Sequence, residues 1–66
     1  MNISINGKTQ TLDVQMSIAA LTEKLGLSAT QIAIEQNGQI VSRSRWADVP
    51  VNEGDTIEIV RFVGGG

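Results

Sequence analysis

The sequence predicts a single α+β domain in which one helix packs across one face of a mixed five-stranded sheet. Three observations predict it: two Asn-Gly dipeptides between alternating apolar segments, one short amphipathic segment between those dipeptides, and an alternating apolar segment near the C-terminus. A chain of 66 residues has room for one domain. A domain of this size buries only roughly 60% of the surface of its unfolded chain, so its core must be small.

Residues 2–14 have the pattern of a β-hairpin. Residues 2–6 alternate apolar and polar side chains, and Asn6-Gly7 accepts the positive φ angles of a two-residue turn. The returning strand is predicted over 8–14, with Leu12 and Val14 directed inward. The register that a two-residue turn requires puts Leu12 on the same face as the isoleucines of the first strand.

Ser17 is expected to cap a helix that runs to about Leu25. The apolar face of this helix recurs at i, i+3, i+4 and i+7, and consists of Ile18, Leu21, Thr22 and Leu25. Gly26 follows at the position where a left-handed residue ends a helix. Because so short a helix is not stable alone, its apolar face must pack on the sheet.

The second half of the chain predicts another hairpin. Ile32 and Ile34 begin the third strand, Asn37-Gly38 forms the turn, and residues 39–42 return. The following segment, 42–51, is expected to be irregular, with one helical turn around Trp46. We expect Trp46 to pack over the small core.

Residues 56–63 predict the last strand, after a turn at 52–55. Strand parity directs Ile40, Val60 and Phe62 to the face of the sheet away from the helix. Three apolar side chains on that face indicate a partner-binding surface. Ordinary scattered surface apolarity, or cover by the segment with Trp46, is the alternative.

The resulting order, β-β-α-β-β-β in so short a chain, is the plan of a β-grasp (ubiquitin-like) domain. In that plan the first and last strands run parallel at the centre of the sheet, which suits a helix on one side. We therefore predict a β-grasp domain over residues 1–63 and a flexible C-terminal glycine tail over 64–66.

The composition excludes several kinds of site. The chain has no Cys and no His, so it has no disulfide, no thiolate or imidazole metal site, no cysteine nucleophile and no histidine base. Its net charge of −2 argues against nucleic-acid binding. The N-terminus lacks a basic or apolar leader and no window is apolar enough to span a membrane, so we expect a cytoplasmic protein.

The acidic residues do not resemble a catalytic or metal site. No two have the spacing of an acid–base pair, and no loop has the density of an EF-hand. We expect all of them to be solvated surface charges: Asp13, Glu23, Glu35, Asp48, Glu53, Asp55 and Glu58.

The three terminal glycines are the candidate functional feature. They lack a Cβ, so the tail is thin, and three extended residues reach roughly 10 Å. Such a tail suits insertion into a narrow channel of a partner enzyme, where the final carboxylate would meet a reactive group. On the glycines alone, a linker without function is an equal alternative.

The segment IVSRSRWADVPVNEGDTIEIVRFVGGG holds an aromatic residue after the fourth strand, a Gly-Asp entry to the last strand, and glycines at its end. Together with the predicted fold and length, it closely resembles the ThiS family, the sulfur carriers of thiamine biosynthesis. That family groups with ubiquitin-like proteins and with the small subunit of molybdopterin synthase. Gly64 adds one glycine to the family's terminal pair, which lengthens the tail without blocking it.

The resemblance implies a carrier that partner enzymes modify, rather than an enzyme. A ThiF-like adenylyltransferase would adenylate the carboxylate of Gly66, with ATP and Mg²⁺ bound to that partner. A persulfide sulfur donor would convert it to a thiocarboxylate, and a ThiG-like thiazole synthase would receive the sulfur. Gly64 and Gly65 would thread the tail into the partners' sites. No cofactor bound to this chain, no nucleic acid and no membrane partner is expected.

Three alternatives stay open at this point. A carrier like the molybdopterin synthase small subunit would share the fold, the tail and the activation, but such carriers are commonly longer. A ubiquitin-like modifier would form isopeptide bonds with lysines. A plain interaction module would have an inert tail.

Overall fold

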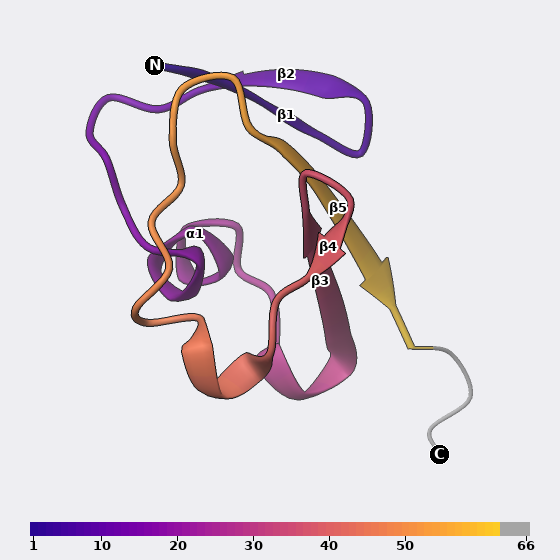
Figure 1. Cartoon of the computed structure of the whole chain (residues 1–66). Helices are drawn as coiled ribbons and strands as arrows, with labels where there is room; N and C mark the ends of the chain where they lie inside the picture. Colours follow the sequence, from indigo (N-terminus) through magenta and orange to yellow (C-terminus); the bar gives the residue numbers. More distant parts are fainter. Residues whose placement is uncertain (63–66) are drawn as a thin grey trace.

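The structure, a computed structural model, describes residues 1–62 (Figure 1). The strands and the helix follow in the order β1 (Asn2–Ile5), β2 (Lys8–Thr11), α1 (Ile18–Lys24), β3 (Ile32–Gln36), β4 (Gln39–Ile40) and β5 (Thr56–Arg61). Two short 3₁₀ turns, Ala29–Gln31 and Arg43–Arg45, precede β3 and follow β4. The predicted element order is confirmed.

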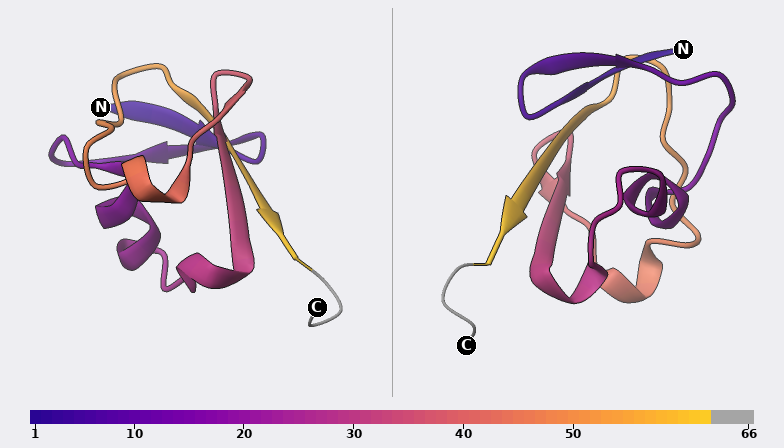
Figure 2. Two further views of the ribbon diagram at one scale, coloured as in Figure 1. Left: turned by 60° about the horizontal axis from the view of Figure 1, so that its bottom comes forward. Right: turned by 180° about the vertical axis from the view of Figure 1, so that it is seen from behind.

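The sheet has the order β2-β1-β5-β3-β4. β1 and β5 run parallel, and the other neighbours run antiparallel. The views of Figures 1 and 2 show α1 on one side of this sheet, so the other face is open. This is the predicted β-grasp arrangement, with β5 as the central strand.

Both Asn-Gly hairpins form as predicted. Asn6 and Gly7 have φ angles of 49° and 82°, and Asn37 and Gly38 have φ angles of 52° and 86°. Positive φ at both turn residues is the requirement of the type I′ turn, which glycine and asparagine tolerate. In the first hairpin Ile5 faces the residue directly after the turn, which is the predicted register.

The helix begins and ends as predicted. The Ser17 hydroxyl accepts a hydrogen bond from the Ala20 amide at 3.1 Å, which satisfies one of the free donors of the first turn. Gly26, with φ 71°, lies just after the C-cap Leu25. The helix buries Ile18, Leu21 and Thr22.

The core lies between α1 and the sheet. Its buried apolar residues come from β1, α1, β3, β5 and the connecting segments, and are Ile3, Leu12, Ile18, Leu21, Ile32, Ile34, Trp46, Val51 and Ile57. Trp46 is only 4% exposed, and its Nε1 donates a hydrogen bond to the Val41 carbonyl at 2.9 Å. The predicted packing role of Trp46 is confirmed.

The prediction that Val14 points inward is wrong, because its side chain is 65% exposed. β2 ends at Thr11, and Leu12 makes the last contact with the neighbouring strand through two backbone hydrogen bonds to Met1, each 2.8 Å. Residues 12–16 lie in no strand, so strand parity no longer applies at Val14.

The return strand of the second hairpin is shorter than predicted. β4 covers only Gln39–Ile40. The Val41 amide still donates to the Ile34 carbonyl at 2.9 Å, and Val41 packs against the core. The predicted inward direction of Val41 is therefore confirmed although the strand ends earlier.

Candidate functional site

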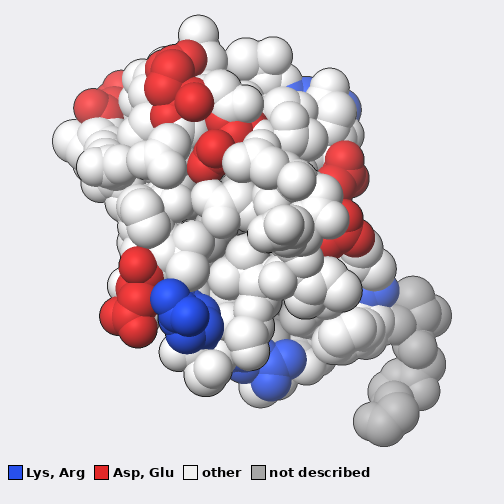
Figure 3. Space-filling view, viewed as in Figure 1, with Lys and Arg blue, Asp and Glu red and all other residues white. Residues whose placement is uncertain are grey.

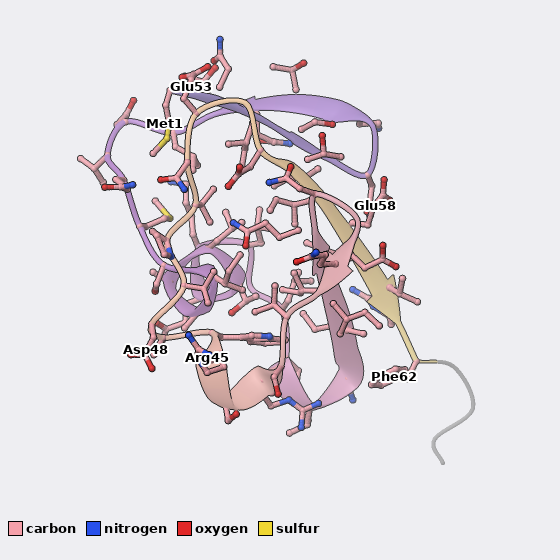
Figure 4. The ribbon with its side chains drawn as sticks, viewed as in Figure 1. Met1, Arg45, Asp48, Glu53, Glu58 and Phe62 are labelled. Carbon is pink, nitrogen blue, oxygen red and sulfur yellow. The ribbon has the colours of Figure 1, made fainter. Side chains whose placement is uncertain are left out.

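The central strand β5 leads to the C-terminal glycines. Residues 63–66 lie outside the described residues, so the roles of Gly64, Gly65 and Gly66 stay predictions. Phe62 is the last described residue, and its amide donates to the Gln31 carbonyl at 2.8 Å (Figure 4). The chain is thus tied to the body of the domain up to Phe62.

β5 is held differently on its two sides. β3 pairs with it through the register that ends at Ile32 and Arg61, whereas β1 pairs with it only as far as Ile57. Beyond that point the Asn6 side chain takes over: its Oδ1 accepts from the Ile59 amide at 2.7 Å, and its Nδ2 donates to the Ile59 carbonyl at 3.3 Å. The Asn6 amide thereby replaces a backbone peptide of the missing strand.

The sequence assigned Asn6 a turn role only, and its support of β5 was missed. An amide side chain can donate and accept like a backbone peptide, but no sequence pattern indicates that this one faces β5. These two hydrogen bonds fix β5 at Ile59, beyond the end of its pairing with β1. They therefore help to position the strand that precedes the C-terminal glycines.

The start of β5 is fixed by a buried carboxylate. Asp55 Oδ2 accepts from the Asn52 amide and from Gln36 Nε2, both at 2.8 Å, and Oδ1 accepts from Asn37 Nδ2 at 3.0 Å. Asn37 Oδ1 in turn accepts from the Thr56 amide at 2.9 Å. This network joins the β3–β4 hairpin to the first residue of β5.

The expectation that Asp55 is a solvated surface charge is wrong, because the residue is only 8% exposed. Burial of the carboxyl raises its pKa, but hydrogen bonds from the Asn52 amide, Asn37 and Gln36 lower it, and the pKa lies below its ordinary value of 3.8. Asp55 is therefore an ionised structural acceptor.

The open face of the sheet carries the predicted apolar residues. Ile40, Val60 and Phe62 are 75%, 52% and 56% exposed. Val60 faces Ala33 across β5 and β3, and Figure 4 shows Phe62 at the end of β5 beside the start of the grey trace. The register confirms the outward direction of Ile40 and Val60, and Phe62 is exposed, while their role in binding a partner stays a prediction.

Two grooves on the surface of residues 1–62 are lined by no acidic side chain. One lies beside β4 with Ile40 and Arg45 in its wall, and the other lies between β5 and the end of α1 with Leu25 and Arg61. Across residues 1–62, no three acidic residues gather at one point. No helix in that range is long and apolar enough to cross a membrane.

Comparison with known proteins gives consistent matches. The model of the ThiS family matches residues 3–66. A thiazole synthase of Paramagnetospirillum magneticum is 42% identical over the whole chain, which spans 20% of that protein. The sulfur carrier protein ThiS of Bacillus subtilis is 43% identical over 35 residues, 53% of each chain.

A solved structure extends the match to three dimensions. The crystal structure of the thiamine biosynthesis protein ThiS from Geobacter metallireducens superposes with a TM-score of 0.87 at 32% identity, and each chain is covered in full. The fold described above is thus the fold of that protein.

Proposed function

The chain belongs to the ThiS family of sulfur carriers in thiamine biosynthesis, and from this membership we propose the route by which it carries sulfur. Members of this family are substrate proteins rather than enzymes. The carboxylate of Gly66 accepts the sulfur. The folded domain presents that carboxylate to the proteins that load and unload it.

The first step overcomes the low reactivity of a carboxylate. An α-carboxyl group has a pKa of about 3.3–3.7, so it is an anion at neutral pH and has no good leaving group. On a ThiF-like adenylyltransferase, which binds ATP and Mg²⁺, an oxygen of Gly66 attacks the α-phosphorus of ATP. Pyrophosphate leaves, and the product is an acyl-adenylate.

The second step introduces sulfur. The terminal sulfur of a persulfide on a donor protein attacks the carbonyl carbon of Gly66, and AMP leaves. A thiol then cleaves the sulfur–sulfur bond, which leaves a thiocarboxylate on Gly66 and a disulfide on the donor side. The thiocarboxylate is the nucleophile that transfers sulfur to a ThiG-like thiazole synthase, and its attachment to a docked domain lowers the entropic cost of the transfer.

The family match that runs to Gly66 is the observation that supports this proposal most strongly. The relative from Paramagnetospirillum magneticum supports thiazole synthase as the acceptor, because a protein of that name contains a region similar to this entire chain. The same relative favours the thiamine pathway over molybdopterin. Gly64 and Gly65 thread the tail into the partners' sites, where a side chain would obstruct it.

Docking on the partners uses the open face of the sheet. Ile40, Val60 and Phe62 form the proposed partner-binding surface, and all three are more than half exposed. Phe62 is also the last described residue before the tail. A partner bound over this face therefore lies next to the point from which residues 63–66 continue.

The test is a mass measurement after reconstitution. The purified chain is incubated with a ThiF-like adenylyltransferase, ATP, Mg²⁺ and a persulfide donor, and its intact mass is recorded. We expect the exchange of one oxygen for sulfur, located at Gly66 by fragmentation. An unchanged mass would contradict the route, and conjugates of higher mass would indicate a protein modifier instead.

A further inference from the structure

Each of the two hairpin turns contains an Asn-Gly dipeptide, a sequence prone to deamidation because glycine puts no side chain in the way of the reaction. The two turns have nearly the same backbone conformation, with φ angles of 49° and 82° at Asn6-Gly7 and of 52° and 86° at Asn37-Gly38. All four residues are exposed. Since the backbones are matched, the side-chain contacts of the two asparagines and their neighbours in sequence remain as sources of a difference in reactivity.

The two asparagine side chains are held by partners of different charge. Within residues 1–62, Asn6 contacts neutral backbone groups of Ile59, through an acceptor bond of 2.7 Å and a long donor bond of 3.3 Å. Asn37 Nδ2 donates at 3.0 Å to the ionised carboxylate of Asp55, and its Oδ1 accepts from the Thr56 amide at 2.9 Å. A hydrogen bond to a charged acceptor is roughly twice as strong as one between neutral groups. Asn37 is therefore held more firmly than Asn6.

A carboxylate would also have different neighbours at the two positions. At Asn6 it would keep the bond from the Ile59 amide and lose the donor to the Ile59 carbonyl. At Asn37 it would face the carboxylate of Asp55, and two like charges at such a distance repel. Figure 3 shows more acidic than basic side chains in the upper half of the view, where the turn between β3 and β4 lies in Figure 1. The fold thus protects more strongly the position at which a new negative charge would be more damaging.

We propose that Asn6 is a site of spontaneous deamidation in the folded protein, and that the modification loosens β5 beyond its pairing with β1. The Gly7 amide nitrogen loses its proton to solvent and attacks Cγ of Asn6, the bond from Cγ to Nδ2 breaks, and the leaving nitrogen takes up a proton and departs as ammonia. Water then opens the cyclic imide, which gives aspartate or isoaspartate. Isoaspartate adds one carbon to the main chain of the turn, and so moves the carboxylate away from Ile59.

The test incubates the unaltered chain at mildly alkaline pH, with and without urea, and follows both sites by mass spectrometry of fragments. Each deamidation raises the mass by the difference between a hydroxyl and an amino group. In urea the two rates report the effect of local sequence alone. After division by the ratio in urea, the ratio of the Asn6 rate to the Asn37 rate in the folded chain should be about tenfold or more, since the anchor of Asn37 includes a charged acceptor.

Asp55→Asn removes the charge that holds Asn37. In this variant the Asn37 rate should rise about tenfold and the Asn6 rate should stay the same. Ser17→Ala is the control for a general loss of stability, because it weakens the helix cap and touches neither turn. It should leave both rates unchanged. Equal increases of both rates in either variant would show that global unfolding controls the reaction, and would overturn the inference.

The effect on β5 is measured by hydrogen exchange. In aged chain that carries isoaspartate in place of Asn6, the Ile59 amide should exchange about tenfold faster than in fresh chain. The Leu21 amide, which donates to the Ser17 carbonyl in α1, should exchange at its original rate. Equal normalised rates at Asn6 and Asn37 in the folded chain would contradict the proposed site, and unchanged exchange at Ile59 would contradict the proposed loosening of β5.

Discussion

Replacing Asp55 by Asn tests the claim that a buried, ionised carboxylate holds the start of β5. The change keeps the shape of the side chain but leaves only one oxygen as an acceptor. If that oxygen stays on Asn37, the new NH₂ group faces the Asn52 amide and Gln36 Nε2, which are both donors. Two hydrogen bonds to a charged acceptor are therefore lost.

The magnitude follows from those two contacts. A hydrogen bond to a charged group contributes about 1.5–3 kcal/mol. Gln36 Nε2 also donates to the Pro50 carbonyl at 3.0 Å and keeps that partner. The free energy of unfolding should therefore fall by about 2–4 kcal/mol, and in a domain of this size each kcal/mol lowers the melting temperature by about 4–8 °C.

The loss should depend on pH in one direction. The pKa of Asp55 is lower in the folded state than its ordinary value of 3.8, so folding favours the ionised form. The stabilisation is complete above that ordinary value and disappears as the pH falls through the lower folded pKa, because the protonated acid loses acceptors. The difference between Asp55→Asn and the unaltered chain should therefore narrow below pH 3.8.

The assay is urea unfolding followed by the fluorescence of Trp46, the single tryptophan, which is buried in the folded state. Asp13→Asn is the control, because Asp13 is exposed and its removal should leave the free energy of unfolding nearly unchanged. Equal stability of Asp55→Asn and the unaltered chain at neutral pH would refute the role given to Asp55, as would a difference of constant size down to acid pH.

Three further substitutions distinguish effects on the stability of the domain from effects on adenylation and partner binding. Gly65→Val should leave the melting temperature unchanged and reduce adenylation strongly; normal pyrophosphate release would argue against a narrow partner channel. Val60→Asp should weaken binding to the adenylyltransferase with little change in stability, since Val60 is 52% exposed; a large drop in the melting temperature would instead assign Val60 to the core. Ser17→Ala should lower the free energy of unfolding by about 1 kcal/mol through loss of the helix cap, and an unchanged urea midpoint would show that the contact to Ala20 contributes nothing.

The features that the sequence predicted correctly are governed by neighbouring residues. The conformation of Asn6-Gly7 and the helix cap at Ser17 depend on residues within one turn of the chain. The outward direction of Val60 follows from the period of two along a strand. These three features can therefore be predicted without knowing which distant segments meet in the fold.

The features that were missed depend on where distant segments meet. Val14 lies past the end of the neighbouring strand, and the sequence does not show where that strand stops providing hydrogen bonds. Asp55 is buried because Gln36 and Asn37, far away in the chain, fold over it. The same holds for the contact of Asn6 with Ile59.

The central claim is tested most directly by an intact-mass measurement after incubation with adenylyltransferase, ATP, Mg²⁺ and persulfide donor. Two chains are compared: the unaltered chain, and a chain shortened by Gly65 and Gly66. The account predicts that the unaltered chain exchanges one oxygen for sulfur at Gly66 and that the shortened chain, although folded, stays unmodified. An equal gain of sulfur by the shortened chain, or a gain located anywhere but Gly66, would contradict the account.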